Sequence, residues 1–170
     1  MSKTLLSVDT GLSPKSLCTG AYWVDGVLVH IEAIKPKEEP MSERIQRLFL
    51  HFQSKGIVDE MVLEIMQVYR AGKSKADPKD LIHLSLLGGC LLTLSKAPAV
   101  LCQPAEWNGG ADKKVTEFRV LRAFKESPTE NAVLYACLKQ FPKGIHHNIY
   151  DGVGIGLNHF GRYKKVSSDA

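Results

Sequence analysis

The 170-residue sequence predicts a single α/β domain, in which a mixed five-stranded β-sheet is flanked by helices. Two observations support this fold class. The hydrophobic patterns follow the order of three strands, a helix, a strand, a helix, a strand and further helices. The length and the 44% content of hydrophobic residues suit one core of ordinary size. We expect residues 1–164 to form this domain and residues 165–170 to be a frayed C-terminal tail.

The first three strands form a meander. Residues 3–9 are a short apolar run that ends in an acid, and residues 18–34 contain two further apolar runs separated by Asp25 and Gly26. An Asp-Gly pair between two strand-like runs is a strong signal for a β-hairpin. Pro36 then ends the meander.

The next elements alternate between helix and strand. Apolar residues at helical spacing predict an amphipathic helix that ends by Gly56: Ile45, Leu48, Phe49 and Phe52. Residues 60–64 and 99–102 are short strands on either side of a polar, basic loop at 65–80 and an apolar helix at 81–94.

Three helical segments complete the domain. The patterns at 112–125 and 129–140 predict helices, but the segment 145–160 is ambiguous from its residues alone. Its aliphatic residues alternate with glycines at 152–157, which is a strand period, and each glycine in a helix costs on the order of 1 kcal/mol.

Three carboxylates occupy positions where a carboxylate is costly. Asp9 ends the first strand, Glu64 ends the fourth, and Asp151 interrupts an apolar segment. A buried carboxylate must be paired, hydrogen-bonded or bound to a metal. If the first and fourth strands are parallel neighbours, Asp9 and Glu64 meet at one sheet edge, and Asp151 can join them from the last helix. Two Mg²⁺ ions about 3.5–4 Å apart in such a cluster suit the in-line attack of water on a phosphodiester.

Basic residues are predicted to bind nucleic acid beside these acids. The loop after Glu64 contains Tyr69, Arg70, Lys73 and Lys75, which suit DNA phosphates and, for Tyr69, an unpaired base. Packing is an equally good interpretation of Tyr69. The Gly-Lys-Ser of this loop is not a nucleotide-binding loop, because position 67, where that motif requires glycine, is glutamine.

A second basic segment begins the helix at 112–125. Lys113 and Lys114 stand at its start and Arg119 follows. Lysine is unfavourable beside the positive end of the helix dipole, so its presence there needs an explanation. The alternative is an ordinary solvated helix start.

The remaining composition excludes several classes of protein. No apolar run is long enough to cross a membrane, and Asp9 interrupts any secretory signal, so we expect a cytoplasmic protein. The net charge of +4 permits a nucleic-acid partner without demanding one. The cysteines lie far apart and are expected to be free, buried thiols: Cys18, Cys90, Cys102 and Cys137.

Four segments in order resemble the motifs of RuvC-like Holliday-junction resolvases, which have the RNase H-like fold. They are LLSVDTG with a following Thr-Gly-Ala, MVLEIMQVY, GADKKV and HHNIYDGVGIGL, and they span residues 4–157. The resemblance implies a Mg²⁺-dependent endonuclease that acts on four-way DNA junctions in recombination and repair, with Asp9, Glu64 and Asp151 as metal ligands. It also implies that Lys113 touches the phosphate of the cleaved strand and that the last segment is a helix. The looseness of the motifs favours a short, phage-type member acting in the cytoplasm of a bacterial host.

The sequence departs from the family pattern in two places. The loop from Gly11 to Thr19 is longer than usual. Many members also have an acid or histidine three residues before the last aspartate, where this sequence has Asn148. His147 lies four residues before Asp151, on the same face of a helix. We therefore predict His147 as the fourth metal-site residue, with Asn148 as the alternative.

A symmetric homodimer is expected from the helix at 81–94. This helix is apolar on every side and must be covered on every side, and a second copy related by a two-fold axis can cover the face that the sheet does not. Gly88 and Gly89 would allow two such helices to approach closely, or would mark a kink. The alternative is that the helices within 112–140 cover this face.

Other functions fit part of the pattern. A terminase-type nuclease, an RNase H or an integrase could use a similar carboxylate cluster. An actin-like phosphotransferase could use residues 8–11 as a phosphate loop but needs two such domains, and a non-catalytic DNA-binding relative would not need three intact carboxylates.

Overall fold

The computed structural model describes residues 2–65 and 77–163. The strands are β1 (Thr4–Asp9), β2 (Cys18–Val24), β3 (Val27–Ile34), β4 (Glu60–Glu64) and β5 (Val100–Cys102). The helices are α1 (Met41–Gln53), α2 (Pro78–Leu92), α3 (Pro104–Trp107), α4 (Lys113–Ala123), α5 (Pro128–Leu138) and α6 (His146–His159), with a 3₁₀ turn at Lys143–Ile145.

The five strands form one mixed sheet in the order β3-β2-β1-β4-β5. β1 is antiparallel to β2 and parallel to β4, and β4 is parallel to β5. The predicted mixed five-stranded sheet is therefore confirmed. The hairpin between β2 and β3 is confirmed as well, since Asp25 and Gly26 both have positive φ, 50° and 80°, as the tight hairpin turn requires.

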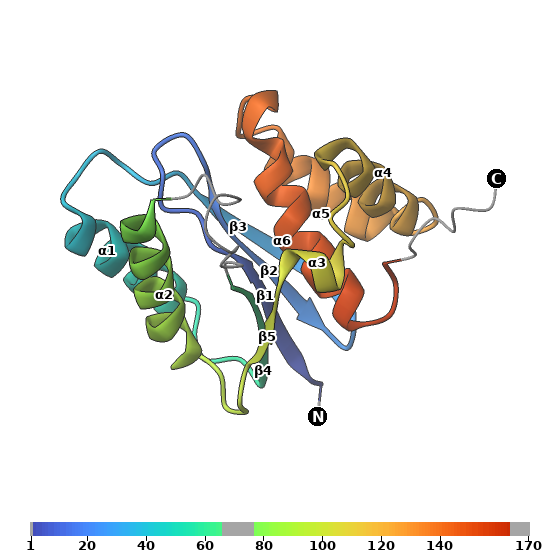
Figure 1. Cartoon of the computed structure of the whole chain (residues 1–170). Helices are drawn as coiled ribbons and strands as arrows, with labels where there is room; N and C mark the ends of the chain where they lie inside the picture. Colours follow the sequence, from blue (N-terminus) through green and yellow to red (C-terminus); the bar gives the residue numbers. More distant parts are fainter. Residues whose placement is uncertain (1, 66–76, 164–170) are drawn as a thin grey trace.

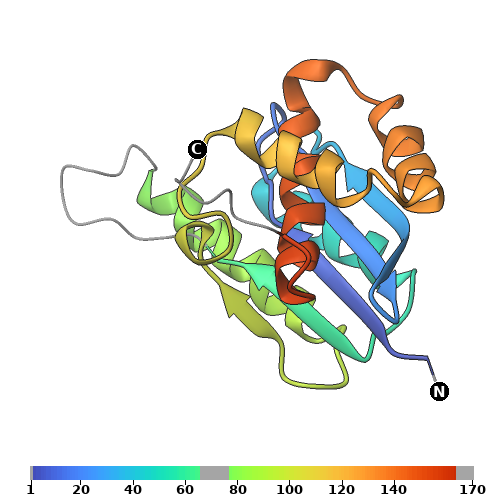
Figure 2. The same cartoon turned by 90° about the vertical axis from the view of Figure 1, so that its right-hand side faces the viewer.

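Helices cover the sheet on both faces (Figures 1 and 2). α1 and α2 pack on one face over a core that includes Leu48, Phe52 and Leu87. α6 lies along the other face over β1 and β2, with α5 packed on β3 beside it and α4 packed against α6. The core of this face includes Trp23 and Trp107. Each face of the sheet thus has its own hydrophobic core.

The last segment is a helix, and its glycines explain how it fits. A Cβ atom on Gly152 would lie 2.9 Å from the side chain of Thr19, and one on Gly156 would lie 2.4 Å from the indole of Trp23. α6 can therefore approach the sheet only because these positions lack side chains. The alternation that imitates a strand period comes from this close approach.

Several boundaries differ from those predicted. α2 starts at Pro78 rather than residue 81, because the side chain of Asp77 accepts a hydrogen bond from the Lys79 backbone and caps the helix. The one-turn helix α3 was not predicted. Cys90 is only half-buried, whereas the other three cysteines are buried as expected.

α2 also corrects the prediction that helices within 112–140 could cover its second face. It packs on α1 and the sheet, whereas α4 and α5 lie on the opposite side (Figure 1). Leu87 is fully buried in the core, but Ile82 and Leu86 are 59% and 55% exposed. In the part of the chain that the structure describes, no helix is both long and apolar enough to cross a membrane.

Candidate active site

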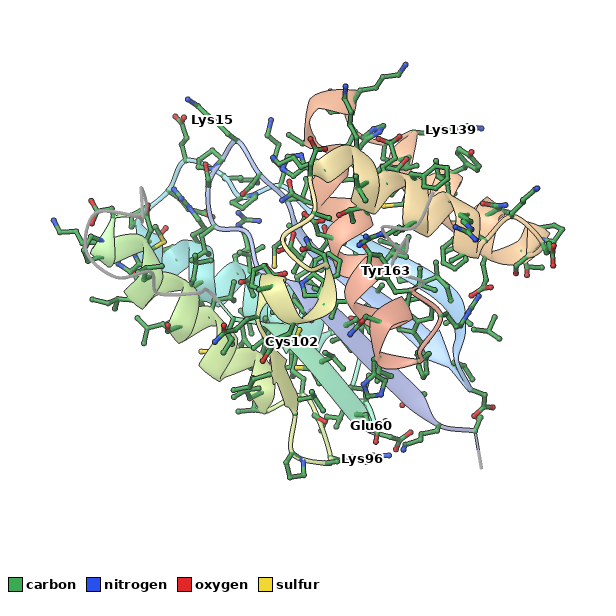
Figure 3. The ribbon with its side chains drawn as sticks, turned by 45° about the vertical axis from the view of Figure 1, so that its right-hand side comes forward. Lys15, Glu60, Lys96, Cys102, Lys139 and Tyr163 are labelled. Atoms are coloured by element: carbon green, nitrogen blue, oxygen red, sulfur yellow. The ribbon has the colours of Figure 1, made fainter. Side chains whose placement is uncertain are left out.

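Asp9 and Glu64 lie side by side at one edge of the sheet. β1 and β4 are parallel and pair Val8 with Leu63. The next residues, Asp9 and Glu64, therefore lie opposite each other at the ends of the two strands. This end of the sheet is opposite to the end where Glu60 and Lys96 lie, whereas Lys15, in the loop that follows β1, lies near it (Figure 3).

α6 brings Asp151 to this edge. The hydroxyl of Ser7 in β1 donates a 2.8 Å hydrogen bond to the carbonyl of Gly152, and the indole N–H of Trp23 donates to the same hydroxyl at 2.9 Å. Because Ser7 and Gly152 are neighbours of the site residues, this buried contact sets the position of Asp151 relative to β1.

The three carboxylates interact electrostatically. Burial, together with the negative charges of Glu64 and Asp151, raises the pKa of Asp9 well above its usual range. Burial and Glu64 raise the pKa of Asp151 to about 7, and burial raises that of Glu64. The positive charge of Lys113 opposes the shifts at Asp9 and Asp151. A cluster of this kind holds excess negative charge that one lysine does not balance.

Asn148, rather than His147, contacts Asp9. Its amide nitrogen donates to the Asp9 carboxylate at 3.4 Å, and its amide oxygen accepts from the backbone N–H of Leu17 at 3.2 Å. His147 is half-buried, and burial and the charge of Lys113 lower its pKa below the usual value. Asn148 reaches Asp9 because the turn of the helix that carries Asp151 points position 148 at β1. The metal-site role predicted for His147 remains a prediction. His147 stays beside Lys113.

Trp107 is a site residue that was not predicted. Its indole N–H donates to the Glu64 carboxylate, and the side chain is 1% exposed. The ring also packs edge-on against Tyr163. The one-turn helix α3 places the ring, and nothing in the local sequence indicates its long-range partner.

The structure separates the predicted basic residues into three groups. Lys113 and Lys114 are exposed at the start of α4, where the Asp112 side chain accepts from the Lys114 backbone and caps the helix. Arg119 is directed into the protein: it donates to the carbonyl of Asn108 at 3.0 Å and covers the ring of Tyr163. The third group lies outside the described residues: Tyr69, Arg70, Lys73 and Lys75.

The donor set fits a hard divalent cation. In residues 2–65 and 77–163, no three His, Cys, Asp or Glu side chains form a ready metal-binding group. The Asp9 carboxylate is turned to Asn148 and the Glu64 carboxylate to Trp107, so both are held by neutral donors. Carboxylate oxygens are nevertheless the ligands that Mg²⁺ prefers, and mutual repulsion among these three acids is what a divalent cation would relieve.

Comparisons with known proteins give structural matches only. No protein-family model and no curated protein sequence matches this chain. RuvC of Thermus thermophilus is similar in structure, with a TM-score of 0.59 and 18% identity over 96% of this chain and 99% of that one. T. thermophilus RuvC in complex with a Holliday-junction substrate gives 0.52 and 15% over 93% and 92% of the two chains. The yeast mitochondrial Holliday-junction resolvase Ydc2 gives 0.58 and 15% over 94% and 78%. The chain therefore has the RNase H-like fold in the form that RuvC-like Holliday-junction resolvases share.

Proposed function

We propose that this protein is a divalent-metal-dependent endonuclease that resolves four-way DNA junctions by paired, symmetric nicks. The observation that carries the proposal is the meeting of Asp9, Glu64 and Asp151 from β1, β4 and α6, with Lys113 beside them. The similarity in fold to resolvases, one of them in complex with a Holliday junction, agrees with it.

The proposed chemistry assigns a task to each residue. The three carboxylates would hold two Mg²⁺ ions, and such ions would supply an activated water and stabilise the leaving 3′-oxygen. Trp107 orients the carboxylate of Glu64, and Asn148 orients that of Asp9. Lys113 is exposed at the start of α4 and stands where it can bind the phosphate of the cleaved strand. His147 would contribute an imidazole whose pKa is lowered by burial and by the charge of Lys113.

A junction has two-fold symmetry, so two matched nicks need two active sites related by the same symmetry. The proposal therefore includes a homodimer, for which the exposed apolar side chains of α2 are the candidate interface. It also includes binding of the junction by Lys114 and by the loop residues Tyr69, Arg70, Lys73 and Lys75.

The direct test compares Mg²⁺-dependent cleavage of a synthetic four-way junction with that of a linear duplex of the same sequence. We expect nicks at symmetric positions in the junction and little or no cleavage of the duplex. Equal cleavage of both substrates would support a general RNase H-like nuclease instead, and binding without cleavage would support a non-catalytic relative.

A further inference from the structure

One arginine of α4 holds the segment that carries Trp107. The guanidinium of Arg119 donates a 3.0 Å hydrogen bond to the backbone carbonyl of Asn108, the residue after Trp107. The same guanidinium lies over the ring of Tyr163, 5.3 Å from the ring centroid. The sequence predicts that Arg119 binds DNA, but these two contacts turn its guanidinium toward the end of α3.

Tyr163 lies between Arg119 and the indole of Trp107. Its ring packs edge-on against the indole, with 5.6 Å between the centroids, and the residue is only 5% exposed. α6 also abuts the indole, since a Cβ atom on Gly154 would lie 2.7 Å from it. The indole N–H in turn donates to the carboxylate of Glu64. A continuous line of contacts therefore runs from the guanidinium to the candidate metal ligand.

Arg119 also holds the loop between α3 and α4, residues 108–112. The two glycines of this loop both have a φ of +71°, and a Cβ atom on either would meet no described residue within 4 Å. The side chain of Asn108 accepts from two backbone N–H groups within the loop itself. Among the described hydrogen bonds of this loop, only that of Arg119 comes from a side chain outside it. The loop leads directly into Lys113, so the same arginine also restrains the start of α4.

We propose that Arg119 is a positioning residue of the active site, which fixes the carboxylate of Glu64 through Tyr163 and Trp107. The effect on cleavage rests on the proposed function, whereas the contacts themselves need neither metal nor DNA. Arginine suits this role because its planar guanidinium donates from its edge and covers an aromatic ring with its face at the same time. Lysine has the charge but not the plane.

The competing role for Arg119 is a contact with a DNA phosphate. In that role the positive charge supplies most of the affinity, so a lysine would largely replace the arginine. In the positioning role a lysine would fail, because it cannot cover Tyr163 and reach the carbonyl of Asn108 together. The two roles therefore predict opposite results for Arg119→Lys.

The first readout uses the metal-free protein and needs no cleavage. A ¹H–¹⁵N NMR spectrum shows the indole N–H of each of the two tryptophans, and Trp107→Phe identifies one signal by its loss. We expect Arg119→Met and Arg119→Lys both to move the Trp107 signal toward the position of a free indole and to speed its hydrogen exchange several-fold. The signal of Trp23, whose N–H donates to Ser7, is the internal reference and should not move.

The second readout is the Mg²⁺ dependence of junction cleavage. Both Arg119 variants should raise the Mg²⁺ concentration for half-maximal cleavage by about 3–10-fold, which is less than the 10–100-fold effect of losing a direct partner of a metal ligand. Arg122→Met is the matched control, because Arg122 is exposed and lines the same hollow of about 520 Å³ at the end of α4 as Arg119 does. It should keep both indole signals and the wild-type Mg²⁺ dependence.

Three results would overturn the positioning role. The first is a Trp107 signal that stays in place in both Arg119 variants. The second is a salt slope of junction binding that falls in Arg119→Met and is restored in Arg119→Lys, which is the signature of a phosphate contact. The third is a shifted signal with wild-type Mg²⁺ dependence, which would confine Arg119 to packing. A wild-type protein that does not cut the junction contradicts the proposed function instead, and the NMR result still decides whether Arg119 positions Trp107.

Discussion

The indole N–H of Trp107 donates a hydrogen bond to the carboxylate of Glu64, and so joins the helix after β5 to the end of β4. The carboxylate is therefore fixed by a neutral donor that does not titrate. Trp107→Phe keeps a smaller aromatic ring near Tyr163 but removes the donor. We expect it to lower Mg²⁺ affinity or the cleavage rate by about 10–100-fold, which is the usual effect of losing a partner of a metal ligand.

The measurement is the cleavage rate as a function of Mg²⁺ concentration. A positioning role predicts that excess Mg²⁺ restores part of the rate, although the smaller ring lowers the melting temperature. A variant that loses only thermal stability and cuts at the wild-type rate would reduce Trp107 to a packing residue.

The three carboxylates should each be indispensable. Asp9→Asn, Glu64→Gln and Asp151→Asn are expected to slow cleavage by about a thousand-fold or more, since metal-centred charge stabilisation supplies several kcal/mol. Junction affinity should stay the same or increase slightly, because negative charge near the DNA is removed. Glu126→Gln, an exposed acid outside the cluster, is the control. Near-wild-type turnover in any of the three would exclude that residue from the site.

The contact of Asn148 with Asp9 predicts that Asn148 matters more for cleavage than the adjacent His147. Asn148→Ala removes the donor to Asp9 and the acceptor for Leu17, so we expect it to slow cleavage by about 10–100-fold. His147→Ala should have a smaller effect, because no hydrogen bond joins His147 to a carboxylate among the described residues. Single-turnover rates of both variants decide the matter. The opposite ranking would support the original assignment of His147 as the fourth metal-site residue.

The hairpin and the acids could be predicted because each depends on neighbours in the chain. Asp25 and Gly26 encode their own turn, and an acid that ends an apolar strand is visible without knowledge of the partner strand. The contact of Trp107 with Glu64 could not be predicted, because 43 residues separate the pair and only the sheet brings them together.

Helical periodicity also does not show which of two adjacent residues of similar polarity faces the site or the core. Asn148 and His147 precede Asp151 by three and four residues, so both lie on its face of the helix, and only the tether to β1 separates them. Likewise, Leu86 and Leu87 are identical in the sequence, but one is 55% exposed and the other is fully buried.

We expect the lysines of the loop after β4 to contribute to junction binding and Lys113 to contribute to cleavage. Lys73→Ala and Lys75→Ala are expected to weaken junction binding. Each should reduce the slope of log affinity against log salt concentration by about one, which corresponds to one lost phosphate contact. Lys113→Ala should instead reduce the cleavage rate more than the affinity. Lys96→Ala is the control, because Lys96 lies at the opposite end of the sheet and is bonded to Asp59 (Figure 3). An unchanged salt slope in the loop variants would indicate that the loop does not bind DNA.

The exposed face of α2 should form a homodimer interface. Ile82 and Leu86 lie one helical turn apart and are 59% and 55% exposed. Gly89 continues their stripe, and a Cβ atom there would meet no described residue within 4 Å. Gly88, in contrast, packs on Leu63 of the sheet, so of the two glycines only Gly89 can bring paired helices close. Burial of this face removes apolar area from water at about 25 cal/mol per Å², which favours a second copy over solvent.

Light scattering at micromolar concentration tests the dimer. We expect a mass near twice 18.8 kDa for the wild type and a shift toward 18.8 kDa for Leu86→Glu. Phe118→Glu introduces the same charge at a similarly exposed site on α4 and should remain dimeric. Leu87 is unsuitable for this test, because a charge at a fully buried position would unfold the domain. A wild-type mass near 18.8 kDa would contradict the dimer, and the two nicks of a junction would then require two independent binding events.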